Sequence, residues 1–324
     1  MTVGRRIGAC FVFVLTAMVM SACGGGDSSD AATASTGGAG STKNVLFAPD
    51  TANNHIGATS TLNPAPGTTL QVGLLTTPVV VAGQNVQYDS VRDWLYAGQG
   101  SSSPFQIAVF SSAGTLSGAI SPARTWQLPT DLIRISKIVL DTVNDTLYVG
   151  GSRTYDSIIY VYPKASTLTG MPVPSKTFGN LPGLADFDVD VPRGLIYYTG
   201  TAPFGIYKMP LATGVAQTVA CGGCVPVGVS IDSAHDRIYV ADLKNVHVIA
   251  GASTSQSKDV AQLAMSNPRL LTYDKNYDRL YVSAYTNVYV LNAVNSISSS
   301  QAAASGTAIY VNGVTSIGGF GLPQ

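Results

Sequence analysis

The stretch Ile231-Asp-Ser-Ala-His-Asp-Arg-Ile-Tyr-Val-Ala-Asp242 contains the end of an apolar strand, a short polar turn and the start of a second strand. An Asp before a tight turn can accept hydrogen bonds from the backbone N–H groups that follow it. Asp236, four positions after Asp232, tolerates the positive φ that such a turn needs. Together these features predict a β-hairpin.

Four other stretches repeat the same pattern, which is Asp, then Asp or Gly four positions later, then Leu or Ile, then Tyr. They are residues 88–97, 140–149, 189–198 and 273–282. The shared tyrosines are Tyr96, Tyr148, Tyr197, Tyr239 and Tyr281, in steps of 52, 49, 42 and 42 residues. A period of this size with several short strands per unit is typical of β-propeller blades. We expect each Tyr ring to pack between blades and to keep its hydroxyl near an edge.

The remainder of each repeat contains enough apolar segments for four strands. Third strands are predicted at residues 107–110, 158–161, 205–208, 246–249 and 288–291. Residues 46–50, with Phe47 at the Tyr position, predict the second strand of one more blade, and residues 316–322 predict its inner strand. The sequence therefore predicts an all-β fold, a six-bladed β-propeller over residues 44–324, in which one blade is closed by N- and C-terminal strands.

The repeat resembles those of NHL and YVTN type propellers. Val225-Pro-Val-Gly-Val-Ser-Ile-Asp232 is similar to the NHL inner strand, and Asn267–Asp274 keeps the Pro but lacks the Gly. This resemblance implies the fold. Propellers of this type act as sensors, scaffolds, carbohydrate or peptide binders and sometimes enzymes, so the resemblance does not select a function. Calcium propellers similar to gluconolactonase use a Glu ligand in the pore, and this chain contains no Glu.

The N-terminal segment predicts export. Arg5 and Arg6 precede an apolar run over residues 7–20, which is too short for a usual membrane span. Met20-Ser-Ala-Cys23 resembles a bacterial lipobox, which implies a lipoprotein signal peptide over residues 1–22 and lipid attachment at Cys23. The alternative is an ordinary signal peptide.

Residues 23–43 consist mainly of Gly, Ser, Ala and Thr, which predicts a flexible tether with a mean reach of roughly 25 Å. The predicted location is therefore the cell envelope, either periplasmic or at the cell surface, as a lipoprotein held to the membrane by its N-terminal lipid. Gly24 after the Cys favours the outer membrane.

The charge balance excludes one class of partner. Lys and Arg total 18, Asp totals 18 and the formal net charge is zero. Without a basic excess or a polybasic patch, we expect no nucleic-acid partner. A monomer that binds an unknown protein, peptide or carbohydrate is the expectation.

Cys221-Gly-Gly-Cys224 is the sharpest local motif. Two close Cys residues in an exported protein favour a structural disulfide. A redox dithiol and a metal site are the alternatives, although the flanking residues predict a loop between strands and not the helix N-terminus that activates thioredoxin-type thiols.

No catalytic motif is present, and no catalytic residue, cofactor or metal ligand is predicted. The three histidines are His55, His235 and His247, and we interpret them as solvated or strand-edge residues. The pair Asp232 and Asp236 offers two carboxylates, whereas calcium needs six to eight oxygens, so we interpret these residues as turn formers.

Side chains four positions before each repeat Asp are expected to face a central channel. They are Asn85, Lys137, Asp186, Gly228 and Leu270, with Arg134, Asp188 and Arg269 close by. From these we predict a polar rim that binds a ligand, formed by Arg134, Lys137, Asp186 and Arg269; the alternative is a water-filled channel. The predicted function is a non-catalytic binding or scaffold protein, and the alternatives are a metal-dependent hydrolase or lyase of the envelope and a purely structural surface protein.

Overall fold

The computed structural model describes residues 45–50, 55–59, 69–70, 73–77, 81–100, 102–284, 287–299, 301–302 and 307–311. The chain divides into two units, residues 1–39 and 40–324, and all described residues belong to the second. The predicted signal peptide, Cys23 and most of the tether lie outside the described residues. Among those residues, no helix has the length and apolarity that a membrane-spanning helix needs.

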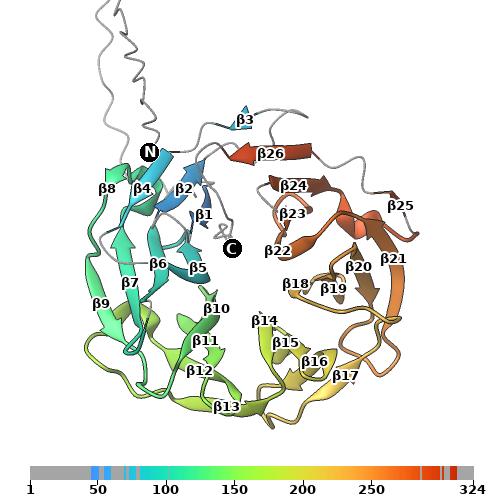
Figure 1. Cartoon of the computed structure of the whole chain (residues 1–324), viewed down its shortest axis with the longest axis horizontal. Helices are drawn as coiled ribbons and strands as arrows, with labels where there is room; N and C mark the ends of the chain where they lie inside the picture. Colours follow the sequence, from blue (N-terminus) through green and yellow to red (C-terminus); the bar gives the residue numbers. More distant parts are fainter. Residues whose placement is uncertain are drawn as a thin grey trace, which may run out of the picture. The chain divides into compact units, whose positions relative to one another are not determined.

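The strands form six blades that follow one another around a ring (Figure 1). Blade 1 contains β1 (Leu46–Asp50), β2 (His55–Thr59) and β4 (Gly73–Thr76). Blade 2 contains β5 (Val81–Asp89), β6 (Trp94–Gln99), β7 (Gln106–Ser111) and β9 (Arg124–Gln127). Blade 3 contains β10 (Arg134–Asp141), β11 (Thr146–Ser152), β12 (Ser157–Pro163) and β13 (Lys176–Leu181).

The other three blades have the same plan. Blade 4 contains β14 (Leu184–Asp190), β15 (Leu195–Thr201), β16 (Phe204–Pro210) and β17 (Gln217–Val219). Blade 5 contains β18 (Gly228–Asp232), β19 (Arg237–Ala241), β20 (Asn245–Ala250) and β21 (Lys258–Ala264). Blade 6 contains β22 (Pro268–Asp274), β23 (Arg279–Ala284), β24 (Asn287–Asn292) and β26 (Thr307–Val311). The predicted six-bladed β-propeller is confirmed.

Blade 1 matches the predicted counterpart of the repeat. Strand β1 pairs antiparallel with β2, and the buried ring of Phe47 lies 5.3 Å from the ring of Tyr88 in the next blade. Phe47 thus occupies the position that Tyr has in the other blades. The predicted inner strand at residues 316–322 lies outside the described residues.

The apolar core is divided among the interfaces between neighbouring blades. Each large cluster of buried residues draws its members from two consecutive blades, as in the cluster that joins Tyr96 and Trp126 of blade 2 to Ile138 and Tyr162 of blade 3. Four of the repeated Tyr rings pack in these interfaces, as predicted: those of Tyr96, Tyr148, Tyr197 and Tyr239. For three of the five, the expected place of the hydroxyl is wrong, because the hydroxyls of Tyr96, Tyr197 and Tyr239 are buried without a hydrogen-bond partner in the described part of the chain.

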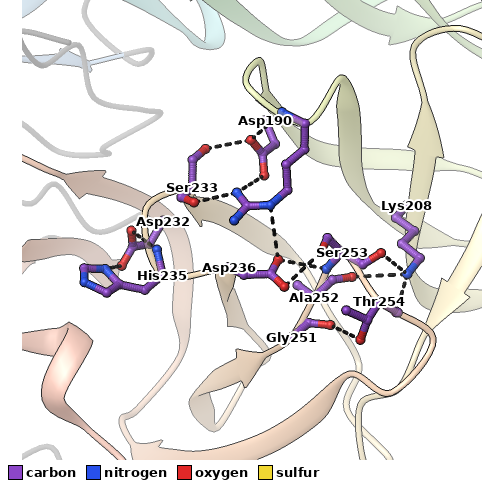
Figure 2. Close-up of polar contacts among 11 residues, drawn as sticks. Asp190, Lys208, Asp232, Ser233, His235, Asp236, Gly251, Ala252, Ser253 and Thr254 are labelled. Atoms are coloured by element: carbon purple, nitrogen blue, oxygen red, sulfur yellow. Dashed lines mark hydrogen bonds and ion pairs between the residues drawn. The ribbon is translucent and has the colours of Figure 1, made fainter.

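The repeated Asp residues build the turns (Figure 2). Asp232 Oδ1 accepts a hydrogen bond from the backbone N–H of His235 at 3.2 Å, and Asp236 has φ 52°. The Asp236 carboxylate also accepts hydrogen bonds from the backbone N–H and the hydroxyl of Ser253, at 3.0 and 2.8 Å. The second Asp therefore joins the turn between the first two strands to the loop after the third strand, which is a structural role.

Short parallel strands join neighbouring blades at the outside of the ring. They are β8 (Gly118–Ala119) on β4, β25 (Gln301–Ala302) on β21 and β3 (Thr69–Leu70) on β26. Because β8 follows the third strand of blade 2 and pairs with blade 1, each addition ties one blade to its predecessor. Three 3-10 turns are present among the described residues. The turn at Ala113–Thr115 precedes β8, the turn at Val294–Ser296 precedes β25, and the third lies at Ala165–Thr167.

Candidate functional site: the channel cavity

A cavity of about 600 Å³ lies where the inner strands β10, β14, β18 and β22 end and their turns begin. We call it the channel cavity. Its lining residues are Gln87, Lys137, Val139, Leu140, Asp141, Thr142, Val143, Asp188, Val189, Val191, Pro192, Ser230, Ile231, Asp232, Ser233, Ala234, Leu271, Thr272, Tyr273 and Lys275. Half of these side chains are apolar, and the charged ones carry both signs.

Lys137 forms a buried ion pair in the wall of the channel. Its Nζ lies 2.9 Å from Oδ1 of Asp186, whose side chain is fully buried, and it also donates to the carbonyl of Val229 at 3.4 Å. Lys137 belongs to blade 3, Asp186 to blade 4 and Val229 to blade 5. The amino group therefore ties three consecutive inner strands together.

Two carboxylates on β14 satisfy the backbone of the next inner strand. Asp186 Oδ2 accepts a hydrogen bond from the N–H of Val229 at 2.8 Å, and Asp188 Oδ2 accepts one from the N–H of Ile231 at 3.1 Å. Ser230 repeats this arrangement toward blade 6, because its hydroxyl accepts a hydrogen bond from the N–H of Tyr273 at 2.9 Å. The inner strands of blades 4, 5 and 6 belong to separate sheets and do not pair with one another through their backbones. These side chains accept the hydrogen bonds of N–H groups that would otherwise have no backbone partner.

Burial dominates the electrostatics of both carboxylates. Removal from water raises the pKa of Asp186 and of Asp188, and the positive charge of Lys137 opposes that rise in each case. Asp188 differs from Asp186 because it also lines the channel cavity. A carboxyl with a raised pKa in a concave site is a candidate binding group.

The structure separates the four predicted rim residues. Lys137 and Asp186 are in contact, as described above. Arg134 and Arg269 lie at the beginning of β10 and β22, whereas the channel cavity lies where these strands end. Both are exposed, and neither lines the cavity. The close approach of β22 to β18 explains why a glycine occupies position 228, because a Cβ there would lie 2.1 Å from the carbonyl oxygen of Arg269.

Sequence reasoning missed the cavity itself and most of its lining. The prediction selected charges at the beginning and middle of the inner strands, whereas the cavity lies at their ends and includes the first turn residues. Val143 is the clearest missed signal: it is an apolar residue inside the polar turn of blade 3, and its side chain is 87% exposed. Blade 2 carries Val91 at the same turn position, 72% exposed, whereas the other copies have Pro, Ala or Asn there. Exposed apolar residues in the turns of two neighbouring blades are the signal that the prediction passed over.

A second polar cluster joins blades 4 and 5 away from the cavity (Figure 2). The amino group of Lys208 donates to the carbonyls of Ala252, Ser253 and Thr254, at 3.3 and 2.9 Å for the first two. Burial lowers the pKa of Lys208. The three carbonyls accept hydrogen bonds from all three N–H groups of the ammonium, so Lys208 joins blade 4 to blade 5 in a structural role.

The two Cys residues form the predicted disulfide, in the loop between β17 and β18. The interpretation of His247 as a solvated or edge residue is wrong, because it is 2% exposed and both ring nitrogens contact carboxylates. His235 does fit that interpretation, with a half-exposed ring 2.7 Å from Asp232. Cys221, His247 and Asp259 place one ligand atom each within 4.8 Å of one another, and none of them lines the channel cavity.

Comparison with known proteins identifies the fold. No protein-family model matches the chain, and no curated protein is similar to it in sequence. A chain in the crystal structure of a nidogen/laminin complex has a TM-score of 0.62 and 16% identity, over 87% of this chain and 98% of that chain. A functionally unknown protein from Desulfotomaculum acetoxidans has a TM-score of 0.54 and 12% identity, over 77% of this chain and 75% of that chain. The likeness is one of fold alone.

Proposed function

We propose that this propeller is a binding protein that holds a peptide segment of a partner protein in the channel cavity. The observation that carries the proposal is the cavity of about 600 Å³ at the ends of four inner strands. This volume lies within the usual range of ligand pockets, about 300–1,000 Å³.

The lining favours a ligand with apolar and charged groups together. Val139, Val189 and Leu271 supply apolar wall, whereas Lys137 and Asp188 supply one charge of each sign. A peptide presents apolar side chains beside donors and acceptors of its backbone, so it matches both kinds of surface. The exposed side chain of Val143 at the mouth offers a first contact for such a segment.

The fold neighbour adds an analogy. This neighbour is a chain of a nidogen/laminin complex, which is a complex between proteins. At 16% identity the likeness does not transfer a partner, but it supports the choice of a protein or peptide over a small metabolite as the first probe.

A pair of matched variants tests the proposal. Val143→Asp places a charge at the mouth of the cavity, and Val173→Asp places the same charge in a loop of the same blade outside the lining; both Val side chains are 87% exposed. Peptides are selected from a displayed random library on the immobilised protein and measured by calorimetry. We expect Val143→Asp to weaken binding at least about tenfold, which corresponds to about 1.4 kcal/mol, and Val173→Asp to leave it unchanged. Equal affinities for both variants, or no selected peptide, would contradict the proposal.

The proposal includes export and lipid attachment at Cys23, on the sequence evidence of the lipobox-like Met20–Cys23. Cys23→Ser removes the acceptor thiol. In cells fed an alkyne fatty acid, we expect the unaltered chain to carry the label and to sediment with membranes, and the variant to do neither. A labelled, membrane-bound variant would show that another residue anchors the chain.

A further inference from the structure

Four side chains with metal-binding chemistry meet in the outer half of blade 5. Cys221 and Cys224 come from the loop that enters the blade, His247 from β20 and Asp259 from β21. The ligand atoms of Cys221, His247 and Asp259 lie within 4.8 Å of one another, and Cys224 is bonded to Cys221. Two thiolates, one imidazole and one carboxylate form a set of four that suits tetrahedral coordination.

The orientation of His247 is already that of a metal ligand. Its Nε2 lies 3.1 Å from Asp242 Oδ2, and its Nδ1 lies 2.8 Å from Asp259 Oδ2. A carboxylate that holds one ring nitrogen as N–H leaves the other nitrogen available, which is the usual outer contact of metal-binding histidines. Asp242 fills that role at Nε2, and Nδ1 is the nitrogen that faces Asp259.

Asp259 provides a second, independent observation. Its Oδ1 is buried and accepts no hydrogen bond from the described residues, while its Oδ2 contacts His247 and Gln262. A buried carboxylate oxygen without a partner is costly, and an ion or an ordered water is the usual explanation. The same carboxylate belongs to the cluster that contains the disulfide sulfur of Cys221.

We propose that reduction of the Cys221–Cys224 disulfide opens a zinc-class site formed by Cys221, Cys224, His247 Nδ1 and Asp259. In the disulfide the sulfurs are bonded to each other and are not available as thiolates, which are the metal-binding form of Cys. The oxidised protein thus has the imidazole and the carboxylate in place and lacks the two sulfur ligands. Gly222 and Gly223 between the two Cys residues, the latter with φ 79°, give the loop freedom to separate them.

A small dithiol supplies the two electrons and two protons that the reduction needs. One dithiol thiolate attacks a sulfur of the disulfide, the second closes the reductant into its own disulfide, and the two electrons and two protons appear as the thiols of Cys221 and Cys224. Zn²⁺ then displaces both thiol protons, and any proton at His247 Nδ1, into solvent. The cyclic disulfide form of the dithiol is the oxidant of the reverse reaction: it takes up the two electrons and two protons, the Cys221–Cys224 bond forms again and Zn²⁺ is released.

Metal titrations of the two redox forms test the proposal. The purified protein is reduced with a dithiol, freed of it by anaerobic gel filtration and dialysed against Zn²⁺, and the same is done with oxidised protein; Co²⁺ serves as a spectroscopic substitute. We expect about one equivalent of tightly held metal with thiolate-to-cobalt absorption in the reduced form, and none in the oxidised form. Absence of binding after reduction, or equal binding in both forms, would overturn the proposal.

Variants assign the ligands. Asp242→Asn is expected to weaken Zn²⁺ binding by the reduced protein about 10- to 100-fold, and loss of a ligand in Asp259→Asn or His247→Asn by more. His235→Asn is the matched control, because His235 also contacts a carboxylate in blade 5, that of Asp232. Unchanged binding by Asp259→Asn and Asp242→Asn, or an equal loss in His235→Asn, would refute the assignment. The two Asp variants keep the test decisive if His247→Asn does not fold.

Discussion

Lys137 shows at the scale of a single residue how the channel wall is held. Its amino group is the partner of a carboxylate, Asp186, that is fully removed from water. Breaking a buried ion pair from one side leaves an uncompensated charge, which is strongly destabilising, whereas removing both charges is far less so. The presence of one charge therefore requires the other, and the pair by itself does not show that the fold gains net stability.

We predict that Lys137→Met lowers the free energy of unfolding by about 3–5 kcal/mol, measured by urea denaturation. The double variant Lys137→Met/Asp186→Asn is expected to recover a large part of that loss, since no charge then stays buried. Lys275→Met is the control, because Lys275 lines the same cavity but is exposed. If Lys137→Met and Lys275→Met are equally stable, the ion pair is not buried in solution.

At the scale of the element, the repeated hairpin turn combines two demands at one position. Asp236 must adopt a positive φ and must also accept hydrogen bonds from Ser253. Asp93, Asp145 and Asp278 have the same backbone conformation. Gly194 meets the first demand only, which shows that the fold tolerates loss of the second in one blade.

Substitution of Asp236 separates these demands. Asp236→Asn keeps the positive φ and the acceptor for the Ser253 N–H, and its amide NH2 donates to the Ser253 hydroxyl oxygen, so it is expected to be nearly neutral. Asp236→Gly keeps the positive φ and loses the two hydrogen bonds, about 0.5–1.5 kcal/mol each. Asp236→Ala loses the hydrogen bonds and adds about 1–2 kcal/mol of backbone strain. Thermal unfolding should rank the variants Asn, Gly, Ala from most to least stable. Equal stability of the Gly and Ala variants would show that the positive φ is not retained.

At the scale of the whole ring, stability is distributed over the interfaces between blades. Separate buried clusters join blades 1 and 2, 2 and 3, 3 and 4, 4 and 5, and 5 and 6. Strand β3 of blade 1 also adds to β26 of blade 6. A short covalent link within one loop is therefore a small part of the total.

We predict that the paired substitution Cys221→Ser/Cys224→Ser costs about 2 kcal/mol at most, because the disulfide closes a loop of only a few residues. The variant should keep the circular dichroism of the parent and unfold in one transition at a slightly lower temperature. Global unfolding on loss of the disulfide would contradict this distribution of stability.

The repeated hairpin and the six blades could be predicted from the sequence. Those features depend on local physics: an Asp before a turn, a residue that accepts positive φ and alternating apolar strands are all readable within about ten residues, and repetition multiplies the signal. The pairing of Cys221 with Cys224 was equally local. The third strands in five blades lie where the apolar runs predicted them.

Which residues meet across blades became known from the folded structure and not from the sequence. The contact of Lys137 with Asp186 spans 49 residues, and the cluster of Cys221 with His247 and Asp259 joins a loop to the two outer strands of the next blade. Burial of the hydroxyls of Tyr96 and Tyr197 is also set by packing against the next blade. A sequence pattern specifies the distance along a chain, whereas the register between blades, fixed by packing of their apolar faces, specifies the distance in space.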